Sequence, residues 1–181
     1  VILTNADVDA VAGLLTLREK TGFELHGHAR ALGQIAAHPI FNVVDPDLAP
    51  RQPLALETPT DLSGLTVTAF AAPGKVALYA EDAAAAVYLG NCAAATDAVR
   101  DRVAGADLLF FDGTLYVDDE MRARGEGVKT GRRMGHISMA GPDGAIAAFA
   151  DTPVGRRVFI HMNNTNPVLL ADSAERAAVE Q

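Results

Sequence analysis

The sequence predicts an α/β fold built from layers of strands and helices. Strand-like and helix-like segments alternate along the 181 residues, an arrangement typical of α/β architectures. Hydrophobic residues make up 49% of the chain and charged residues only 21%, so the chain can bury a real core and is not generally disordered. No internal repeat and no low-complexity linker interrupts it, and we therefore expect residues 1–181 to form a single domain.

Two strand patterns and two helix patterns come first. Residues 1–4 are apolar and predict a short strand, and apolar residues at helical spacing follow as far as Gly22, a common helix stop. Alternation over 23–28 predicts the next strand. The segment 29–39 fits a helix that Pro39 ends, because proline cannot continue it.

The middle of the chain carries mostly strand patterns. Residues 42–64 are rich in proline and aspartate and predict a loop that contains one short strand at 52–57. Alternating and apolar residues predict further strands at 65–70 and 75–82. The strand expected at 86–89 follows almost directly, without the usual turn residues.

The last part alternates helix and strand patterns again. After a short helix at 93–105, the segment 106–114 is a buried strand that ends in a polar turn. Residues 125–135 are rich in glycine and basic side chains and predict a loop. The remaining expected elements are helices at 118–125 and 142–150, a strand that begins at 156 and runs into a polar loop by 167, and a final helix capped by Asp172 or Ser173.

The charge balance and cysteine count exclude several classes of protein. Lys plus Arg is 15 and Asp plus Glu is 23, a formal net charge of −8, which argues against a nucleic-acid partner because that needs a basic surface over the phosphates. A single cysteine cannot form an internal disulfide. No apolar run approaches the ~20 residues of a membrane helix and no signal peptide is visible, so we expect a cytoplasmic protein without a membrane span.

Polar residues gather where the predicted strands end. Polar turns follow three strands, at 5–9, 111–114 and 161–166, and His136 adds a fourth polar point. In α/β sheets functional sites lie beyond the carboxyl ends of the strands, and carboxylates together with imidazoles suit a divalent metal. The combination predicts a metal site.

Each of these residues taken alone also has a structural explanation. Asp9 could help to cap a helix, Asp112 before a glycine could be an ordinary turn residue, and His161 could be a hydrogen-bonded core histidine. His26 and His28 share one strand face and could hold a metal together. No third ligand follows them closely, so we discount that pair.

Longer motifs resemble a known family. They span nearly the whole chain and read TNADVDAVAGLLTLRE, AFAAPGKVALYAED, GADLLFFDGT, KTGRRMGHISMAGPDGAIAAFAD and RRVFIHMNNTNPVLLADSAERAAVE. These segments resemble the pyrroloquinoline quinone (PQQ) synthesis protein B family. The resemblance implies a metallo-β-lactamase-like αββα sandwich.

The same resemblance implies a role in making the redox cofactor PQQ from a peptide precursor. It allows two activities: a non-haem iron oxygenase that hydroxylates the tyrosine of the Glu-Tyr-derived precursor, or a non-catalytic carrier that moves PQQ or its precursor towards the periplasm. A hydrolase is a weaker third alternative. Hydrolysis in this superfamily normally uses two metals, and the first-site histidine pair is absent here.

The resemblance also assigns site residues. Asp9, His161 and Asp112 are the expected ligands of a divalent metal, with Fe(II) as the expected ion and zinc as the alternative. His136 and Asp112 are the expected catalytic residues. Ala10 stands where the family has a histidine ligand, and because alanine has no donor atom we expect weakened metal binding and impaired activity.

The expected substrate contacts are Arg132, Arg133, Asn163 and Asn164. PQQ and its precursors carry several carboxylates, and arginine pairs with carboxylates bidentately. Simple solvated charge is the alternative for the arginines. Cys92 is expected to lie beside the site.

Parts of the family pattern are missing from this sequence. We expect the chain to be a fragment that lacks an N-terminal region, an internal strand pair at the position of Ala83–Ala86, and part of a C-terminal strand. A sandwich without edge strands exposes unpaired backbone and apolar faces. We therefore expect an incomplete fold that is marginally stable or is completed by a second copy in a homodimer.

Overall fold

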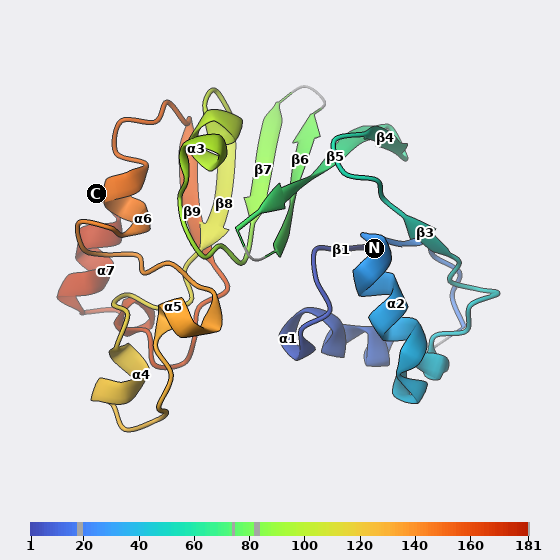
Figure 1. Ribbon diagram of the computed structural model, residues 1–181, viewed down its shortest axis with the longest axis horizontal. Coiled ribbons are helices and arrows are strands. Elements are labelled where there is room, and N and C mark those ends of the chain that lie inside the picture. Colours follow the sequence, from blue (N-terminus) through green and yellow to red (C-terminus); the bar gives the residue numbers. More distant parts are fainter. Residues whose placement is uncertain (18–19, 74, 82–83, 181) are drawn as a thin grey trace.

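The structure is a computed structural model that describes residues 1–17, 20–73 and 84–180, together with the backbone of 75–81. Its strands form two sheets, one of three strands and one of six (Figure 1). Figure 1 shows α1 and α2 beside the small sheet, and α3 and α6 beside the large one. This arrangement of sheets and flanking helices confirms the predicted α/β class.

The three-stranded sheet is parallel, and its strands are β1 (Ile2–Leu3), β2 (Leu25–Gly27) and β3 (Arg51–Pro53). The helices between them are α1 (Val8–Val11), α2 (Ala29–Ala37) and the 3-10 turns Ala12–Thr16 and Pro39–Val43. Leu3, Leu25 and Ile35 are buried in the core between this sheet and its helices. Burying one such side chain contributes about 1.5–3 kcal/mol, so this core holds α1 in place behind β1.

The six-stranded sheet runs in the order of the sequence. Its strands are β4 (Pro59–Leu62), β5 (Leu65–Ala72), β6 (Lys75–Glu81), β7 (Ala85–Leu89), β8 (Leu108–Asp112) and β9 (Arg156–Ile160). β4 to β7 pair antiparallel, whereas β7, β8 and β9 pair parallel. The sheet is therefore a chain of hairpins that continues into a parallel half.

Helices connect and cover the parallel half. They are α3 (Asp97–Val103), α4 (Glu120–Ala123), α5 (Gly131–Met134), α6 (Ala145–Ala148), the 3-10 turn Pro167–Leu169 and α7 (Ala174–Val179). Thr96 caps α3 by accepting a hydrogen bond from the backbone N–H of Val99. Val99 and Val103 of this helix pack with Leu89 and Leu109 in the larger core.

The register of the parallel strands decides where the polar turns lie. Leu89 pairs with Phe111, Phe111 with Phe159, and Asp112 with Ile160. Because parallel strands end at the same edge of a sheet, the residues that follow β7, β8 and β9 meet there. The predicted gathering of polar turns beyond the strand ends therefore agrees with the sheet topology.

Most expected strands and helices are present with shorter bounds, but two expectations are wrong. The segment predicted as a loop contains β4, which forms a hairpin with β5 through Ser63 and Gly64, both with positive φ. The sequence did not predict this strand because Pro59 and Asp61 are residue types that disfavour sheets. The loop predicted at 125–135 contains α5, capped by the Thr130 side chain and ended by Gly135 at φ +87°.

Two further expectations concern chain length and membranes. β6 and β7 pair directly, Glu81 opposite Ala85, at the place where the resemblance implies an internal strand pair in the family. Ala83 itself lies outside the described residues. Among the helices of the described part of the chain, none is long and apolar enough to cross a membrane.

Candidate metal and acid–base site

The candidate site lies beyond the carboxyl ends of β1, β8 and β9. Asp112 is the last residue of β8, and His161 follows β9 directly. Asp9 belongs to the helix that follows β1, and His136 follows α5. Four of the residues predicted as ligands or catalytic groups therefore come from four different elements to one place.

Asp112 is fully buried and its carboxylate accepts four hydrogen bonds. Oδ2 accepts from the backbone N–H of Cys92 at 2.8 Å and lies 2.7 Å from His136 Nδ1. Oδ1 accepts from the backbone N–H of Thr114 at 3.0 Å and from its hydroxyl at 2.5 Å. A buried charge is stable only when it is paired and hydrogen-bonded, and these four donors meet that need.

The two histidines stand side by side. The rings of His136 and His161 are stacked, with centroids 5.5 Å apart and planes 23° apart. Their side chains are 12% and 29% exposed, so His161 is the more open to solvent. Asp112, His136 and His161 each offer a potential ligand atom, and these atoms lie within 4.8 Å of one another.

His161 is held on both sides of its ring. Its Nδ1 lies 2.8 Å from the Thr114 hydroxyl, and its Nε2 contacts Asp9 Oδ2. This hydrogen bond to His161 is the main cause that lowers the pKa of Asp9, with the charge of His161 acting in the same direction and burial opposing. Burial, together with the Asp9 charge, raises the pKa of nearby Tyr88.

His161 has a left-handed backbone with φ +58°, a conformation that side-chain-bearing residues adopt rarely. Two asparagines of the following loop hold the backbone there. Asn163 donates its backbone N–H to the Thr114 carbonyl at 3.0 Å, and buried Asn166 donates its side-chain amide to the Gly113 carbonyl at 2.8 Å. The strand-end loops after β8 and β9 are thus bonded to each other.

A buried glutamate supports the same loop. Glu120 accepts the backbone N–H of Tyr116 at 2.8 Å and the hydroxyl of Thr165 at 2.6 Å. Thr165 in turn accepts the side-chain amide of Asn163 at 2.8 Å. Gly113 allows the two loops to come this close, because a Cβ there would lie 3.0 Å from the Ile160 carbonyl oxygen.

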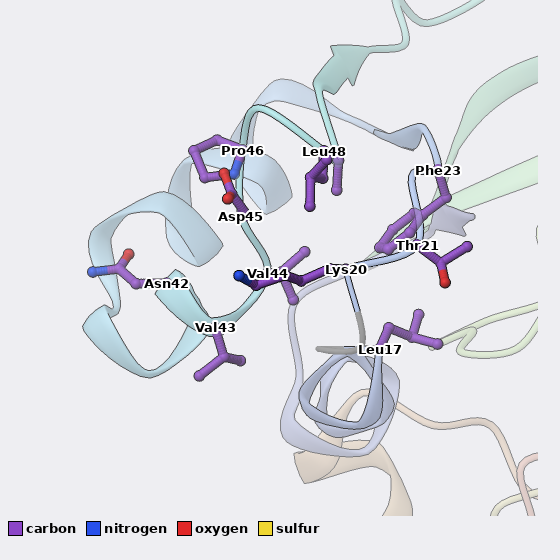
Figure 2. A pocket seen from close by; sticks show the side chains of 11 residues that line it. Leu17, Lys20, Thr21, Phe23, Asn42, Val43, Val44, Asp45, Pro46 and Leu48 are labelled. Carbon is purple, nitrogen blue, oxygen red and sulfur yellow. The ribbon is translucent and has the colours of Figure 1, made fainter.

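A cavity of about 520 Å³ lies beside Asp9 and Ala10. Its walls are mainly apolar and include Tyr88 and Phe110, whose rings are 6.4 Å apart. A second hollow of about 270 Å³ lies between the Lys20 segment and the turn at Asp45 (Figure 2). None of the predicted site residues lines that second hollow.

Three of the four predicted substrate contacts, namely Arg132, Arg133 and Asn163, form hydrogen bonds with residues outside the cluster. The Arg132 guanidinium pairs with Asp143 at 3.2 Å, and both side chains are exposed. Arg133 is exposed, and its backbone N–H completes the cap of α5. Asn163 donates to Thr165, while Asn164 is exposed.

The two histidines that we discounted as a metal site, His26 and His28, and the single cysteine, Cys92, also have local partners. His26 Nε2 lies 3.0 Å from Glu24, whereas His28 Nδ1 accepts the backbone N–H of Arg30. The two histidines thus have separate structural partners. Cys92 lies beside the site as expected, because its backbone N–H binds Asp112, and burial raises the pKa of its thiol to about 11.

Sequence reasoning gave no role to two buried residues of the site. Thr114 contacts Asp112, His136 and His161 through one hydroxyl. Asn91 accepts the side-chain amide of Asn5 at 2.8 Å, which joins the loop after β1 to the loop after β7. Thr114 lies in the polar turn that the sequence did single out, but a motif does not show where a hydroxyl points.

Comparisons with known proteins cover nearly the whole chain. Residues 1–162 match the family model described as a beta-lactamase superfamily domain. The chain is 46% identical to the coenzyme PQQ synthesis protein B of Methylobacterium sp. (strain 4-46), over 99% of this chain and 67% of that protein. It is 48% identical to PqqB from Methylobacterium extorquens, whose Zn²⁺-bound crystal structure matches with a TM-score of 0.93 over 99% of this chain and 64% of that one.

A more distant structure shows the shared fold alone. The metallo-beta-lactamase fold protein YhfI from Bacillus subtilis is 17% identical, with a TM-score of 0.67 over 90% of this chain and 64% of that one. This match agrees with the expected sandwich architecture.

The chain spans about two-thirds of the length of the PQQ synthesis proteins that it matches. The alignment with the Methylobacterium sp. protein extends over 201 residues, more than the 181 present here. That relative therefore carries internal residues without a counterpart here, as the expected internal shortening requires. The extent of the family-model match and the near-half identity show that this protein belongs to the coenzyme PQQ synthesis protein B family of the beta-lactamase superfamily.

Proposed function

We propose that this chain serves PQQ biosynthesis as a metal-dependent oxygenase that hydroxylates the tyrosine of a Glu-Tyr-derived precursor. The observation that carries the proposal is the contact between Asp9 Oδ2 and His161 Nε2, beside the stacked ring of His136. A carboxylate and an imidazole in contact are two of the three ligands in the two-histidine, one-carboxylate set of many non-haem Fe(II) oxygenases. Family membership supports PQQ as the product towards which the chemistry is directed.

The residues present fit a divalent metal. Asp9 and His161 are 54% and 29% exposed and belong to the accessible side of the cluster, so an ion can reach them from solvent. A bound Fe(II) would supply the oxygen chemistry through its open positions. The same donors suit zinc, and the PqqB of Methylobacterium extorquens was crystallised with Zn²⁺.

Asp112 has a different proposed role. Both of its oxygens already accept two hydrogen bonds each, so little capacity remains for a metal. We propose that Asp112 orients His136, and its expected role as a ligand stays a prediction. His136, with Nδ1 held by Asp112, can use Nε2 to take or return a proton of the substrate phenol.

Arg132, Arg133, Asn163 and Asn164 remain the proposed contacts for substrate carboxylates. The Arg132–Asp143 pair is exposed and contributes little to stability, so a substrate carboxylate can replace Asp143. The apolar cavity beside Asp9 offers space for the aromatic part of the same substrate.

A non-catalytic carrier is the second candidate function, and Ala10 favours it. Ala10 is exposed next to Asp9 and offers no donor atom where the family resemblance implies a histidine. A protein that keeps the pocket but binds metal weakly would bind the precursor without converting it. Cytoplasmic location and a homodimer are further proposals that follow from the sequence.

The test compares the chain with Ala10→His, His161→Ala and the control His38→Ala, an exposed histidine outside the site. Each protein is loaded with Fe(II) and given a Glu-Tyr peptide, O2 and ascorbate, which supplies the two electrons that reduce the second oxygen atom to water, and O2 uptake and product mass are measured. If the chain is an oxygenase, its product is heavier than the peptide by one oxygen atom. Ala10→His should then take up O2 faster than the unaltered chain, His161→Ala should be inactive, and His38→Ala should react at the unaltered rate. If neither the chain nor Ala10→His binds iron or forms product, while the peptide still binds, the oxygenase is refuted and the carrier supported.

A further inference from the structure

We infer that Thr114 is a positioning residue whose hydroxyl keeps a proton on Nδ1 of His161 and thereby leaves Nε2 as the nitrogen that faces a metal. The inference deepens the proposed function and rests on it for the identity of the metal ligands. It is carried by the contacts of a single buried oxygen atom. Thr114 Oγ1 lies 2.5 Å from Asp112 Oδ1, 3.0 Å from His136 Nδ1 and 2.8 Å from His161 Nδ1.

Counting protons gives each of these contacts a direction. A hydroxyl has one proton to donate and two lone pairs that accept. The Asp112 carboxylate can only accept, so the hydroxyl proton of Thr114 goes to Asp112. Nδ1 of His161 must then donate to Oγ1 and therefore carries a proton, whereas the single proton on Nδ1 of His136 is shared between Oγ1 and the nearer Asp112 Oδ2.

The other nitrogen of His161 decides whether the site can hold an ion. Nε2 contacts Asp9 Oδ2, which itself can only accept a hydrogen bond. In the metal-free protein a proton on Nε2 satisfies this contact, and a metal can bind the pair only by displacing that proton. Because Thr114 accepts from Nδ1, the proton that a cation displaces is the one on Nε2, and Nε2 and Asp9 then both offer lone pairs to that cation.

Backbone hydrogen bonds hold the Thr114 segment in place independently of the Thr114 hydroxyl. The Thr114 N–H donates to Asp112 Oδ1, and its carbonyl accepts from the backbone N–H of Asn163. A substitution that removes only the hydroxyl therefore keeps both loop connections. Thr114→Val removes the hydroxyl at nearly constant volume, and Thr114→Ser retains it.

The test measures the protonation of individual histidine nitrogens and, separately, metal affinity. Nitrogen NMR of the metal-free proteins reports which ring nitrogen of His161 carries a proton, with assignment from His161→Ala. Calorimetric titration with Zn²⁺ then gives the affinity. We expect Thr114→Val to remove the proton from Nδ1 of His161 while the one on Nε2 stays, and to weaken Zn²⁺ binding by roughly 10–100-fold, the usual effect of losing such a partner.

Thr114→Ser should restore both readouts, and Thr152→Val, which alters a buried threonine outside the cluster, should leave both unchanged. A wild-type His161 without a proton on Nδ1 overturns the inference, even if Thr114→Val does not fold. So does a Thr114→Val protein with wild-type protonation and affinity. If Thr114→Val loses the Nδ1 proton as expected but wild type binds no metal, the role of Thr114 in holding that proton stands and the proposed metal-dependent function fails.

Discussion

The two aspartates of the site, Asp112 and Asp9, lie in opposite environments. Asp112 is a fully buried charge with four donors around it, whereas Asp9 is a half-exposed charge that faces His161. The first depends on its hydrogen bonds for stability, because the interior offers no water in their place. The second can exchange its partner for an ion from solvent. The two carboxylates should therefore respond differently to substitution.

Asp112→Asn should destabilise the protein strongly. The amide that replaces one carboxylate oxygen cannot accept, so donors now bound there lose their partner, and a buried unsatisfied donor costs about 1–3 kcal/mol. Urea unfolding followed by circular dichroism measures the loss. The control Asp151→Asn, on an exposed residue, should unfold like wild type, and an equally stable Asp112→Asn protein would contradict the assigned hydrogen bonds.

Asp9 should make stability depend on pH in the acid range. Its pKa in the folded protein lies below the ordinary 3.8, chiefly because His161 hydrogen-bonds to it. A lowered pKa stabilises the folded state above pH 3.8, and this contribution disappears as the pH falls from there through the folded-state pKa. The urea midpoint should fall more between neutral and acid pH for wild type than for Asp9→Asn. Parallel curves of urea midpoint against pH for the two proteins would contradict this prediction.

At the level of elements, the loops after β8 and β9 form one unit. Glu120 at the start of α4 accepts from both loops, through Tyr116 and Thr165. Its contribution is structural, since it orders the segment that carries His161 without contacting the ring nitrogens of that residue in any of the described bonds.

Glu120→Ala should leave two donors without their acceptor and cost roughly 1–3 kcal/mol in the free energy of unfolding. Chemical denaturation checks this value. Glu120→Gln, which retains one acceptor oxygen, should recover part of the loss, and Glu126→Ala, at an exposed residue, should have little effect. A Glu120→Ala protein as stable as Glu126→Ala would show that the two loops do not depend on this side chain.

The sequence predicted elements better than it predicted their interactions. Apolar runs such as those of β7 and β8 are visible in the sequence because Leu89 and Leu109 of these strands are buried in the core. The strand at Pro59–Leu62 was missed because its pairing depends on the hairpin at Ser63 and Gly64. Asp9, Asp112, His136 and His161 could be named from motifs, whereas the role of Thr114 depends on sheet register and rotamer, which no motif contains.

For the whole molecule, the site joins the two sheets. Asp9 follows a strand of the small sheet and His161 a strand of the large one, 152 positions apart in sequence. The buried Asn5–Asn91 bond connects the same two parts. A ligand shared by Asp9 and His161 would bind the folded chain and not the unfolded one, so it should stabilise the entire fold.

Zn²⁺ at about 100 times its dissociation constant should stabilise the folded chain by about 2.7 kcal/mol, the value that mass action gives for one site. Thermal unfolding with and without the ion measures the shift. His161→Ala should abolish the shift, and His38→Ala should preserve it. An equal shift in all three proteins would place the bound ion elsewhere on the chain.

The pairing of Asp112 with Ile160 also limits how this chain can change in length. One residue added to or removed from β9 would carry His161 about 3.3 Å along the strand and turn its alternating side chains to the opposite face. The exposed turn around Gly125 carries no such restriction, because the backbone N–H groups of Gly131 and Arg132 bind Asp118 and hold the start of α5 beside the start of α4. Descendants of this sequence can therefore lengthen or shorten there while the spacing within β8 and β9 stays constant.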